Sequence, residues 1–343
     1  MQKLYLAGAA ALLVIGISST VAYNYRYHLY DLLPSTDESE LANTDGLIYD
    51  KNGKLFTGRV KDSTDTGYSI YSYKDGELDG LNVVFSEGKL SEIGHWVDGK
   101  QNGLFESWNQ EGNLIDHGTF KDGERDGQTV QYYPDSGTLR VKAQYKAGKL
   151  NGMVEQYYPS GKLQFKHNFV DNQLHGTALD YYENGVLKSK VNFELGVQNG
   201  PYQTFSESGK PLEEGSIQDG KRHGHYKTYF PDSDKVAMEA NFKLGNLDGQ
   251  MIRYRPDGAK VVQNYVNGKP DGYQKNYSPD GRLMGEVEMK DGRPTGRFKL
   301  YDQQGNLVEE SEGIKNSDID LSDNTEDEII VDDAPSERSM SSI

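Results

Sequence analysis

Histidines are the first side chains of this chain to test for metal or acid–base chemistry. Among the seven histidines, His223 and His225 stand two residues apart, a spacing that metal ligands use. No matching carboxylate or third histidine follows at a fixed distance. His175 and His223 also occupy a slot that Asn or Asp fills in the other copies of a repeating unit, which makes them turn residues by position. We therefore predict no metal site.

Carboxylates recur at one turn position, in Asp75, Asp98, Asp122, Asp171, Asp219 and Asp291. A short polar side chain at such a position caps the local backbone. A glycosidase needs two carboxylates in different environments, and equal copies on a repeat offer no such asymmetry. The recurring Gly-x-x-x-Gly, as in Gly99 to Gly103, lacks the Gly-Lys-Ser/Thr of a phosphate loop. With no cysteine for thiol chemistry, we expect no catalytic residue, no cofactor and no enzyme activity.

A repeat organises most of the chain. Glycines recur at intervals of 23 to 25 residues, at Gly80, Gly103, Gly127, Gly152, Gly176, Gly200, Gly224, Gly249, Gly272 and Gly296. Five residues after each of them stands an aromatic residue, and a second large apolar residue precedes each return turn. Ten copies at this regularity indicate a tandem array in which each unit packs on its neighbours.

Each unit reads as strand, turn, strand, turn. The second strand, for example residues 139–145, alternates apolar and polar residues, so one face is buried and the other is solvated. In the first strand the apolar positions fall two and five residues after the glycine, as in Val154 and Tyr157, which point to opposite faces of an ideal strand. Either a bulge shifts the register or both faces are partly covered.

Consecutive hairpins of one length should pair edge to edge. The predicted fold class is therefore all-β: an elongated twisted antiparallel sheet of tandem β-hairpin repeats of about 24 residues. It is flanked by an N-terminal transmembrane helix and a disordered acidic C-terminal tail. The expected domains are a signal anchor over residues 1–24, a linker over 25–46, the repeat array over 47–308 and the tail over 309–343.

The repeat resembles the MORN-repeat variant, and most of all the bacterial proteins described as YwqK-family antitoxins. The resemblance spans about residues 47–308 and rests on the pattern Tyr145, Gly148, Gly152, Tyr157, Tyr158, Gly161 and Leu163. It implies extended β-hairpin arrays that contact proteins or lipids, with no catalytic residues to carry over. The chain departs from the pattern at Asn172, Asp234 and Lys260.

The two ends of the chain differ from the array. Residues 4–23 are apolar over about the length of a membrane-spanning helix, which predicts an anchor in the inner membrane with the array in the periplasm or outside the cell. The alternative is secretion after cleavage near Ala22. Between Glu309 and Ile343 there are 12 acidic and 2 basic residues, a net charge of −10 out of −16 for the whole chain. The remaining −6 gives nucleic acid no net attraction.

Residues six positions after each glycine are the candidates for partner binding. The first two and the last three copies carry polar or charged side chains there. The middle copies carry rings, at Tyr133, Tyr158, Tyr182 and Phe230, with Ser206 between the last two. Either a curled middle buries these rings, or they form an exposed strip on which a protein docks.

These features predict a protein-binding repeat protein of the cell envelope, most specifically an immunity or antitoxin factor. It would neutralise a toxin, encoded nearby, by covering the active site of that toxin. The alternative is an envelope scaffold without a toxin partner. The sequence does not determine the oligomeric state.

Overall fold

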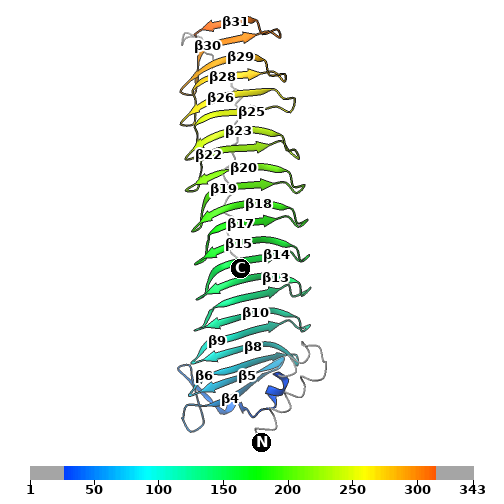
Figure 1. The fold of residues 1–343 in the computed structure, drawn as a ribbon. Helices are drawn as coiled ribbons and strands as arrows, with labels where there is room; N and C mark the ends of the chain where they lie inside the picture. Colours follow the sequence, from blue (N-terminus) through cyan, green and yellow to red (C-terminus); the bar gives the residue numbers. More distant parts are fainter. Residues whose placement is uncertain (1–26, 314–343) are drawn as a thin grey trace. The chain divides into compact units, whose positions relative to one another are not determined.

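The computed structural model describes residues 27–313, which divide into two compact units between Asn246 and Leu247. In each unit, strands that follow one another in the chain lie side by side (Figure 1). Pairs of strands are antiparallel within and between successive hairpins. This matches the predicted pairing of consecutive hairpins.

The first unit holds the longer run of hairpins. Its strands are β4 (Gly58–Thr64), β5 (Gly67–Lys74), β6 (Glu77–Leu78), β7 (Gly80–Ser86), β8 (Lys89–Val97), β9 (Lys100–Trp108), β10 (Leu114–Lys121), β11 (Glu124–Arg125), β12 (Gly127–Tyr132), β13 (Leu139–Lys146), β14 (Lys149–Tyr157), β15 (Leu163–Val170), β16 (Gln173–Leu174), β17 (Gly176–Tyr181), β18 (Leu187–Glu194), β19 (Val197–Phe205), β20 (Pro211–Gln218), β21 (Lys221–Arg222), β22 (Gly224–Tyr229) and β23 (Val236–Lys243). β24 (Asn246–Leu247) spans the division between the units.

The second unit continues the same pattern by itself. Its strands are β25 (Gly249–Tyr254), β26 (Lys260–Val266), β27 (Lys269–Pro270), β28 (Gly272–Tyr277), β29 (Leu283–Lys290), β30 (Arg293–Tyr301) and β31 (Leu307–Glu312). Met251 and Tyr265 are buried here.

The predicted fold needs a correction. Within residues 27–313 no helix is long and apolar enough to cross a membrane, so the fold class with a transmembrane helix is wrong for the part of the chain that the structure describes. What fits is the all-β sheet of many strands. The expected anchor over residues 1–24 and the cleavage site near Ala22 lie outside the described residues, as does most of the acidic tail.

The first strand of each repeat is regular, so its two apolar positions point to opposite faces: Val154 is buried on one face, whereas the Tyr157 hydroxyl donates to Glu155 on the other. Both faces are therefore partly covered, and the bulge lies in the second strand. Gln156 pairs with Phe165, yet the next residue, Tyr157, pairs with Leu163, so Gln164 is an extra residue in β15. The same shift occurs in the hairpins β12–β13, β17–β18 and β19–β20. A bulge at a constant place bends every hairpin in the same way.

The alternation of side chains gives the middle repeats two unlike faces. The inner face, defined by Val154, Ala178 and Tyr202, is buried, with exposed fractions of 0, 4 and 4%. Val154 packs there with Val141, Ala143 and Phe169 from neighbouring strands. The outer face, defined by the cross-strand pair Glu155 and Lys166, carries charges that bind each other at 2.9 Å. A single sheet thus buries one face only.

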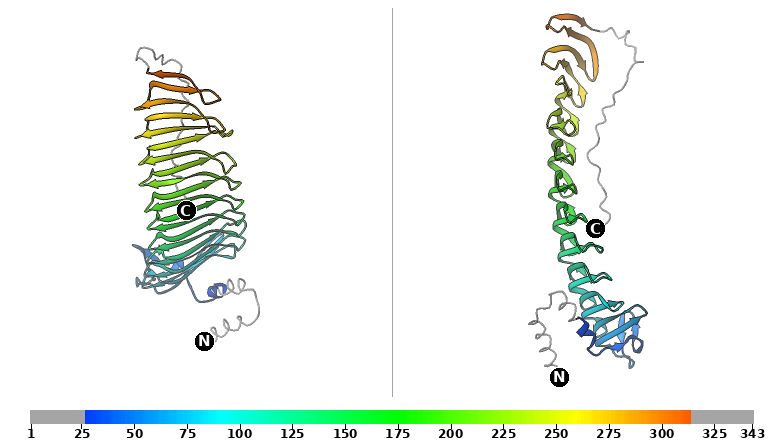
Figure 2. Two further views of the ribbon diagram at one scale, coloured as in Figure 1. Left: turned by 45° about the horizontal axis from the view of Figure 1, so that its top comes forward. Right: turned by 90° about the vertical axis from the view of Figure 1, so that its right-hand side faces the viewer.

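The first strands of unit 1 are the exception, because part of the chain covers their outer face. Residues 27–31 form a helical turn (Figure 2). Tyr27 from this turn packs with Ile70, Val83, Phe85 and Ile93 in one buried cluster. Next along the chain, β1 (Thr36–Asp37) pairs in parallel with β4. It is followed by the 3-10 helix η2 (Glu38–Glu40) and by a hairpin of β2 (Ala42–Thr44) and β3 (Leu47–Tyr49). The segment predicted as a linker therefore includes part of the core.

Candidate binding surface

The ring positions predicted to bind a partner all open the turn that joins the two strands of a hairpin. The backbone N–H of Tyr158 donates to the carbonyl of Lys162 at 2.8 Å, and Gly161 donates back to the Tyr158 carbonyl at 2.8 Å. Tyr133 and Tyr182 close their turns in the same way. Gly161 has a φ of 80°, which glycine adopts without steric cost. The turn chemistry therefore holds each ring at the same place in its repeat.

The hydroxyls of three successive tyrosines tie each repeat to the next. Tyr133 donates to the carbonyl of Tyr157 at 2.8 Å, and Tyr158 donates to the carbonyl of Tyr181 at 2.9 Å. Tyr182 donates to the carbonyl of Phe205 at 2.9 Å. We call Tyr133, Tyr158 and Tyr182 the tyrosine row. Because both ends of each side chain are fixed, the rings are held in place before any partner arrives.

The rings of the tyrosine row are half-buried. The sequence left open whether these rings are buried or form an exposed strip. The structure lies between the two, because the hydroxyls bond to the next repeat while part of each ring remains accessible. Phe230 occupies the equivalent position in a later repeat and is half-buried too, but it has no hydroxyl to make the bond. The structure brings the three tyrosines into one row of equivalent contacts; their role in partner binding stays a prediction.

Acidic groups surround the middle of the tyrosine row. Burial raises the pKa of the Tyr158 hydroxyl, and the nearby carboxylates of Glu183, Asp180 and Glu207 raise that pKa further. The ammonium group of Lys188 lies 5.6 Å from the centre of the Tyr182 ring. The raised pKa keeps the Tyr158 hydroxyl neutral at physiological pH.

Two ion pairs on the inner face were not predicted from the sequence. Arg125 binds Asp116 at 2.6 Å, and Arg222 binds Glu213 at 3.1 Å. In both repeats a glycine stands where other copies carry a side chain such as Ala143 or Val191.

These glycines make room for the inner-face side chains around the ion pairs. A Cβ on Gly118 would lie 2.8 Å from Arg125 Nη1. A Cβ on Gly215 would lie 3.1 Å from the Tyr202 ring. In the sequence, each ion pair is marked by a glycine outside any turn that is followed seven residues later by the arginine. Both carboxylates are satisfied by their arginines, which indicates a structural role.

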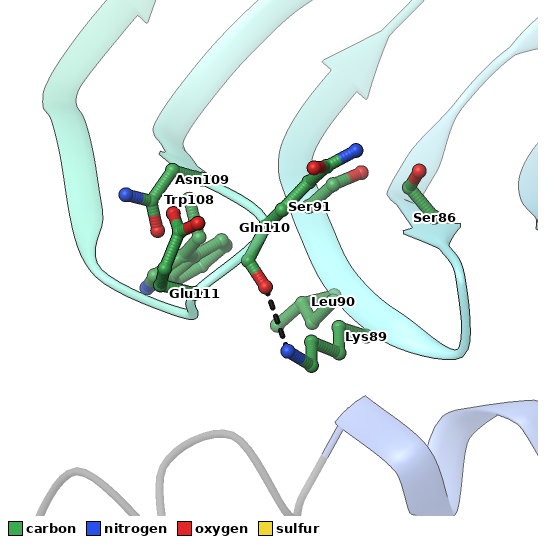
Figure 3. A pocket seen from close by; sticks show the side chains of 8 residues that line it. All are labelled: Ser86, Lys89, Leu90, Ser91, Trp108, Asn109, Gln110 and Glu111. Carbon is green, nitrogen blue, oxygen red and sulfur yellow. Dashed lines mark hydrogen bonds between the residues drawn. The ribbon is translucent and has the colours of Figure 1, made fainter. Parts of the chain in front are cut away.

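A shallow hollow of about 500 Å³ lies between two successive turns near the start of the array (Figure 3). Its floor includes Leu90 and Trp108, which are 5% and 7% exposed and belong to the buried cluster around Phe85. Lys89 Nζ closes one side by donating to the carbonyl of Gln110 at 2.7 Å. The floor is thus part of the core, and the hollow offers no convergent set of catalytic groups.

Histidines and carboxylates do not converge on a metal site in the described part of the chain. Over residues 27–313 no group of three or more His, Asp or Glu side chains is placed to hold a metal ion. His225 lies 3.5 Å from Glu239, whereas the Nδ1 atom of His223 is buried without a hydrogen-bond partner. The expectation that the chain is not an enzyme stays a prediction.

Comparison with known families supports the type of repeat. The MORN repeat variant family matches residues 150–171, 174–194 and 198–219. Tyr158 and Tyr182 lie within these matches. The chain is therefore a repeat protein with MORN-variant repeats in these three stretches; the finer likeness to YwqK-family antitoxins stays a prediction.

Other comparisons add no functional information. The comparison with curated proteins finds no match. Among solved structures, the crystal structure of TcdB2-TccC3-TEV is 12% identical over 69% of this chain and 15% of that chain, with a TM-score of 0.18. TcdB2-TccC3 without its hypervariable C-terminal region is 11% identical over 76% of this chain and 18% of that chain, also with a TM-score of 0.18. The chain thus spans less than a fifth of these proteins, and such scores carry no argument about function.

Proposed function

We propose that the protein is a repeat protein that binds another protein along the tyrosine row. The observation that supports this most is the set of equivalent hydroxyl bonds from Tyr133, Tyr158 and Tyr182 to the next repeat. Binding orders side chains at an entropic cost, and rings that are already ordered avoid most of that cost. Tyrosine also offers a large contact area with few rotatable bonds.

The size and charge of the row suggest the kind of partner. Repeats two strands wide place successive rings about 9.6 Å apart, because neighbouring strands lie about 4.8 Å apart. Three rings therefore reach over roughly 19 Å, which suits an extended surface of a folded protein. The carboxylates near Tyr158 favour basic groups on that surface.

Co-purification with the protein encoded by the adjacent gene tests the proposal. The wild-type chain is expected to retain this protein. The triple variant Tyr133→Ala, Tyr158→Ala, Tyr182→Ala is expected to lose at least tenfold in affinity, because truncating aromatic anchors removes most of the contact energy. The matched triple variant to Phe keeps the rings and loses only the hydroxyl bonds, so it should bind much more tightly than the Ala variant.

A second control separates the row from aromatic surface in general. Tyr273 is 40% exposed and lies in the second unit, outside the row. Tyr273→Ala should leave binding unchanged. Equal retention of the partner by the wild type and the triple Ala variant would rule out the tyrosine row as the binding site.

The narrower form of the proposal is that the bound protein is a toxin and that binding covers its active site. Only the resemblance to the antitoxin family favours this form. Co-expression with the candidate toxin should permit growth with the wild-type chain and not with the triple Ala variant. If the partner binds but growth never depends on it, the scaffold alternative is the better description.

A further inference from the structure

The hollow near the start of the array lies at the position where the repeat elsewhere carries a ring of the tyrosine row. Ser86 stands six residues after its glycine, as Tyr133, Tyr158 and Tyr182 do in their own repeats. Ser86 lines the hollow together with Trp108, which belongs to the next repeat (Figure 3). The hollow therefore occupies a defined place in the repeat.

In the tyrosine row the side chain at this position bridges to the next repeat. The Tyr133 hydroxyl donates to the carbonyl of Tyr157 at 2.8 Å, and the Tyr158 hydroxyl donates to the carbonyl of Tyr181 at 2.9 Å. Each acceptor stands five residues after the glycine of its repeat. The residue at that position after Ser86 is Trp108, so the Trp108 carbonyl is the corresponding acceptor.

Serine is too short to make this bridge. In the following repeat Asn109 still reaches forward, because its Nδ2 donates to the carbonyl of Pro134 at 2.8 Å. Ser86 ends at its hydroxyl, so among the described residues the Trp108 carbonyl lacks the phenolic partner that the row supplies elsewhere. The space that a ring takes up in the row is left open beside Ser86.

The lining of the hollow suits a neutral ring with one hydroxyl. Leu90 and Trp108 form an apolar floor on which an aromatic ring can pack. Lys89 and Glu111 line it with opposite charges, so the site selects neither an anion nor a cation. The volume of about 500 Å³ leaves room for a phenolic ring, since an apolar cavity of about 150 Å³ already holds benzene.

We infer that the hollow binds the side chain of a tyrosine from the partner protein. The ring lies on Leu90 and Trp108, and its hydroxyl donates to the carbonyl of Trp108. The inserted tyrosine thus makes the bond that Tyr133 makes to Tyr157 within the chain. The inference rests on the proposed function for the source of the ring only, because the hollow and its acceptor belong to this chain.

Continuity with the tyrosine row favours the partner as the source of the ring. The hollow lies on the same series of turns, two repeats before Tyr133, which is about 19 Å along the array. A partner that lies along the row reaches the hollow as it extends toward the start of the array. Tyrosine is also among the side chains that most often anchor an interface by filling a pocket.

Titration with N-acetyltyrosinamide tests the hollow in the absence of a partner. The full chain labelled with fluorotryptophan gives one fluorine NMR signal for each of its two tryptophans. The Trp108 signal should shift with millimolar affinity, because a single side chain supplies little binding energy. The Trp96 signal should not shift, since Trp96 lies at the other end of β8 from the hollow. Equal shifts of both signals, or no shift of Trp108, would overturn the site.

A probe without the hydroxyl tests the proposed hydrogen bond. N-acetylphenylalaninamide should bind about twofold to tenfold more weakly than N-acetyltyrosinamide, which is the range for one hydrogen bond. Equal affinity of the two probes would show that the Trp108 carbonyl does not receive the hydroxyl, and the phenolic assignment would be wrong.

Ser86→Tyr supplies the hollow with a ring of the chain's own. This variant should abolish the shift of Trp108 by the probe. The matched control is Ser206→Tyr, at the same position of a repeat that does not line the hollow, and it should bind the probe as the wild type does. Unchanged probe binding by Ser86→Tyr would place the probe elsewhere and overturn the inference.

A tyrosine of this chain is the competing occupant. Tyr25 stands two residues before Tyr27, which packs in the same cluster as Leu90 and Trp108. Two residues of chain span at most about 7 Å. Tyr25→Ala should leave the affinity for the probe unchanged. An affinity at least tenfold higher in this variant would mean that the chain's own ring fills the hollow, and the assignment to a partner would be wrong.

Retention of the partner separates this inference from the proposed function. Ser86→Tyr leaves the tyrosine row intact and should weaken partner binding at least tenfold, because it excludes the inserted ring. Full retention by Ser86→Tyr, with loss by the triple Ala variant, would support the row and overturn the partner as the source of the ring. If no partner is retained by the wild type, the proposed function fails, while the probe titration still decides whether the hollow binds a phenolic ring.

Discussion

The first and the middle repeats of unit 1 place different residues in the same column of the outer face. In the first repeats the column is Ile70, Val83 and Ile93, paired across β5, β7 and β8 and fully buried. In the middle repeats it continues with Glu155 and Lys166, paired across β14 and β15. The same hairpin thus tolerates an apolar or a charged column, and what differs is whether another segment covers it.

This difference shows what supplies stability in each region. The first repeats have a core on the outer face that is covered by Tyr27 and Tyr30 from residues 27–31. Arg59 holds this segment by donating to the carbonyl of Tyr30. The middle repeats depend on a single buried face with small clusters such as that of Val154. We therefore expect the start of the array to unfold last and the middle repeats to be sensitive to local changes.

The largest effect should come from removing a ring from the covered region. Phe85 is 1% exposed and stacks on Tyr68 with ring centres 4.7 Å apart. Phe85→Ala should lower the free energy of unfolding by about 3–5 kcal/mol, because it leaves a cavity between the sheet and the helical turn. Urea denaturation followed by circular dichroism measures this loss.

The matched control is Phe205→Ala, in the same position of a middle repeat. Phe205 is half-buried and faces the uncovered outer side. Its loss should be about 1 kcal/mol, since only part of the ring is removed from water. Equal losses for the two variants would mean that residues 27–31 add no protection and would remove the distinction between the two regions.

A smaller effect is expected from detaching the helical turn itself. The Arg59 guanidinium donates to the carbonyl of Tyr30 at 2.7 Å and lies 4.4 Å from the centre of the Tyr30 ring. Arg59→Ala should lower the free energy of unfolding by about 1–3 kcal/mol, the range for hydrogen bonds to a charged group. Hydrogen exchange should accelerate in β5 and β7 and stay unchanged in β17.

Arg140 provides the comparison from the middle repeats. It donates to Gln131 Oε1 at 2.5 Å on the open sheet. Arg140→Ala should change the free energy of unfolding by less than about 1 kcal/mol, as for other surface hydrogen bonds. Faster exchange in β17 after Arg59→Ala would contradict the view that the helical turn protects only the strands that it covers.

The sequence determined the hairpin repeat well, because its signals are local. Glycine spacing, turn residues and alternation in residues 139–145 predicted the strands that form. The bulge at Gln164 was not predicted in the second strand, since an extra residue in β15 leaves no mark of its own in the repeat. The packing of Tyr27 could not be predicted, because residues 25–46 carry no periodic pattern and their contacts are distant in the chain.

The sequence predicted where the residues of the candidate site lie in each repeat, but not the hydrogen bonds that they make. The aromatic residues at Tyr133, Tyr158 and Tyr182 followed from the repeat register. Their hydroxyl bonds join one repeat to the carbonyl of the next, which depends on the spacing of neighbouring hairpins in space. The ion pair of Arg222 with Glu213 escaped prediction for the same reason, although Gly215 marked the space that it needs.

The smallest expected effect is a pH dependence of stability that comes from a carboxylate in the middle repeats. In the middle repeats, His167 Nε2 lies 3.0 Å from Asp180 Oδ1, and Ser189 donates to the same carboxylate at 2.5 Å. Burial raises the pKa of Asp180, but the hydrogen bonds from His167 and Ser189 outweigh burial and bring that pKa below its usual value. A carboxylate with a lowered pKa stabilises the fold above its unfolded pKa of about 3.9, and this contribution disappears as the pH falls through the folded pKa.

Thermal unfolding of the wild type and of Asp180→Asn between pH 3 and pH 7 measures this contribution. The wild type should melt at a higher temperature at pH 7. The difference should shrink as the pH falls below about 4, where the carboxyl of the unfolded chain takes up a proton, and should disappear once the pH falls below the lowered pKa of folded Asp180. The Phe85 side chain carries no charge and packs in a cluster of hydrophobic side chains, so Phe85→Ala should keep a nearly constant deficit over the same range. A difference for Asp180→Asn that does not depend on pH would show that the side chain acts through its shape and not through its charge.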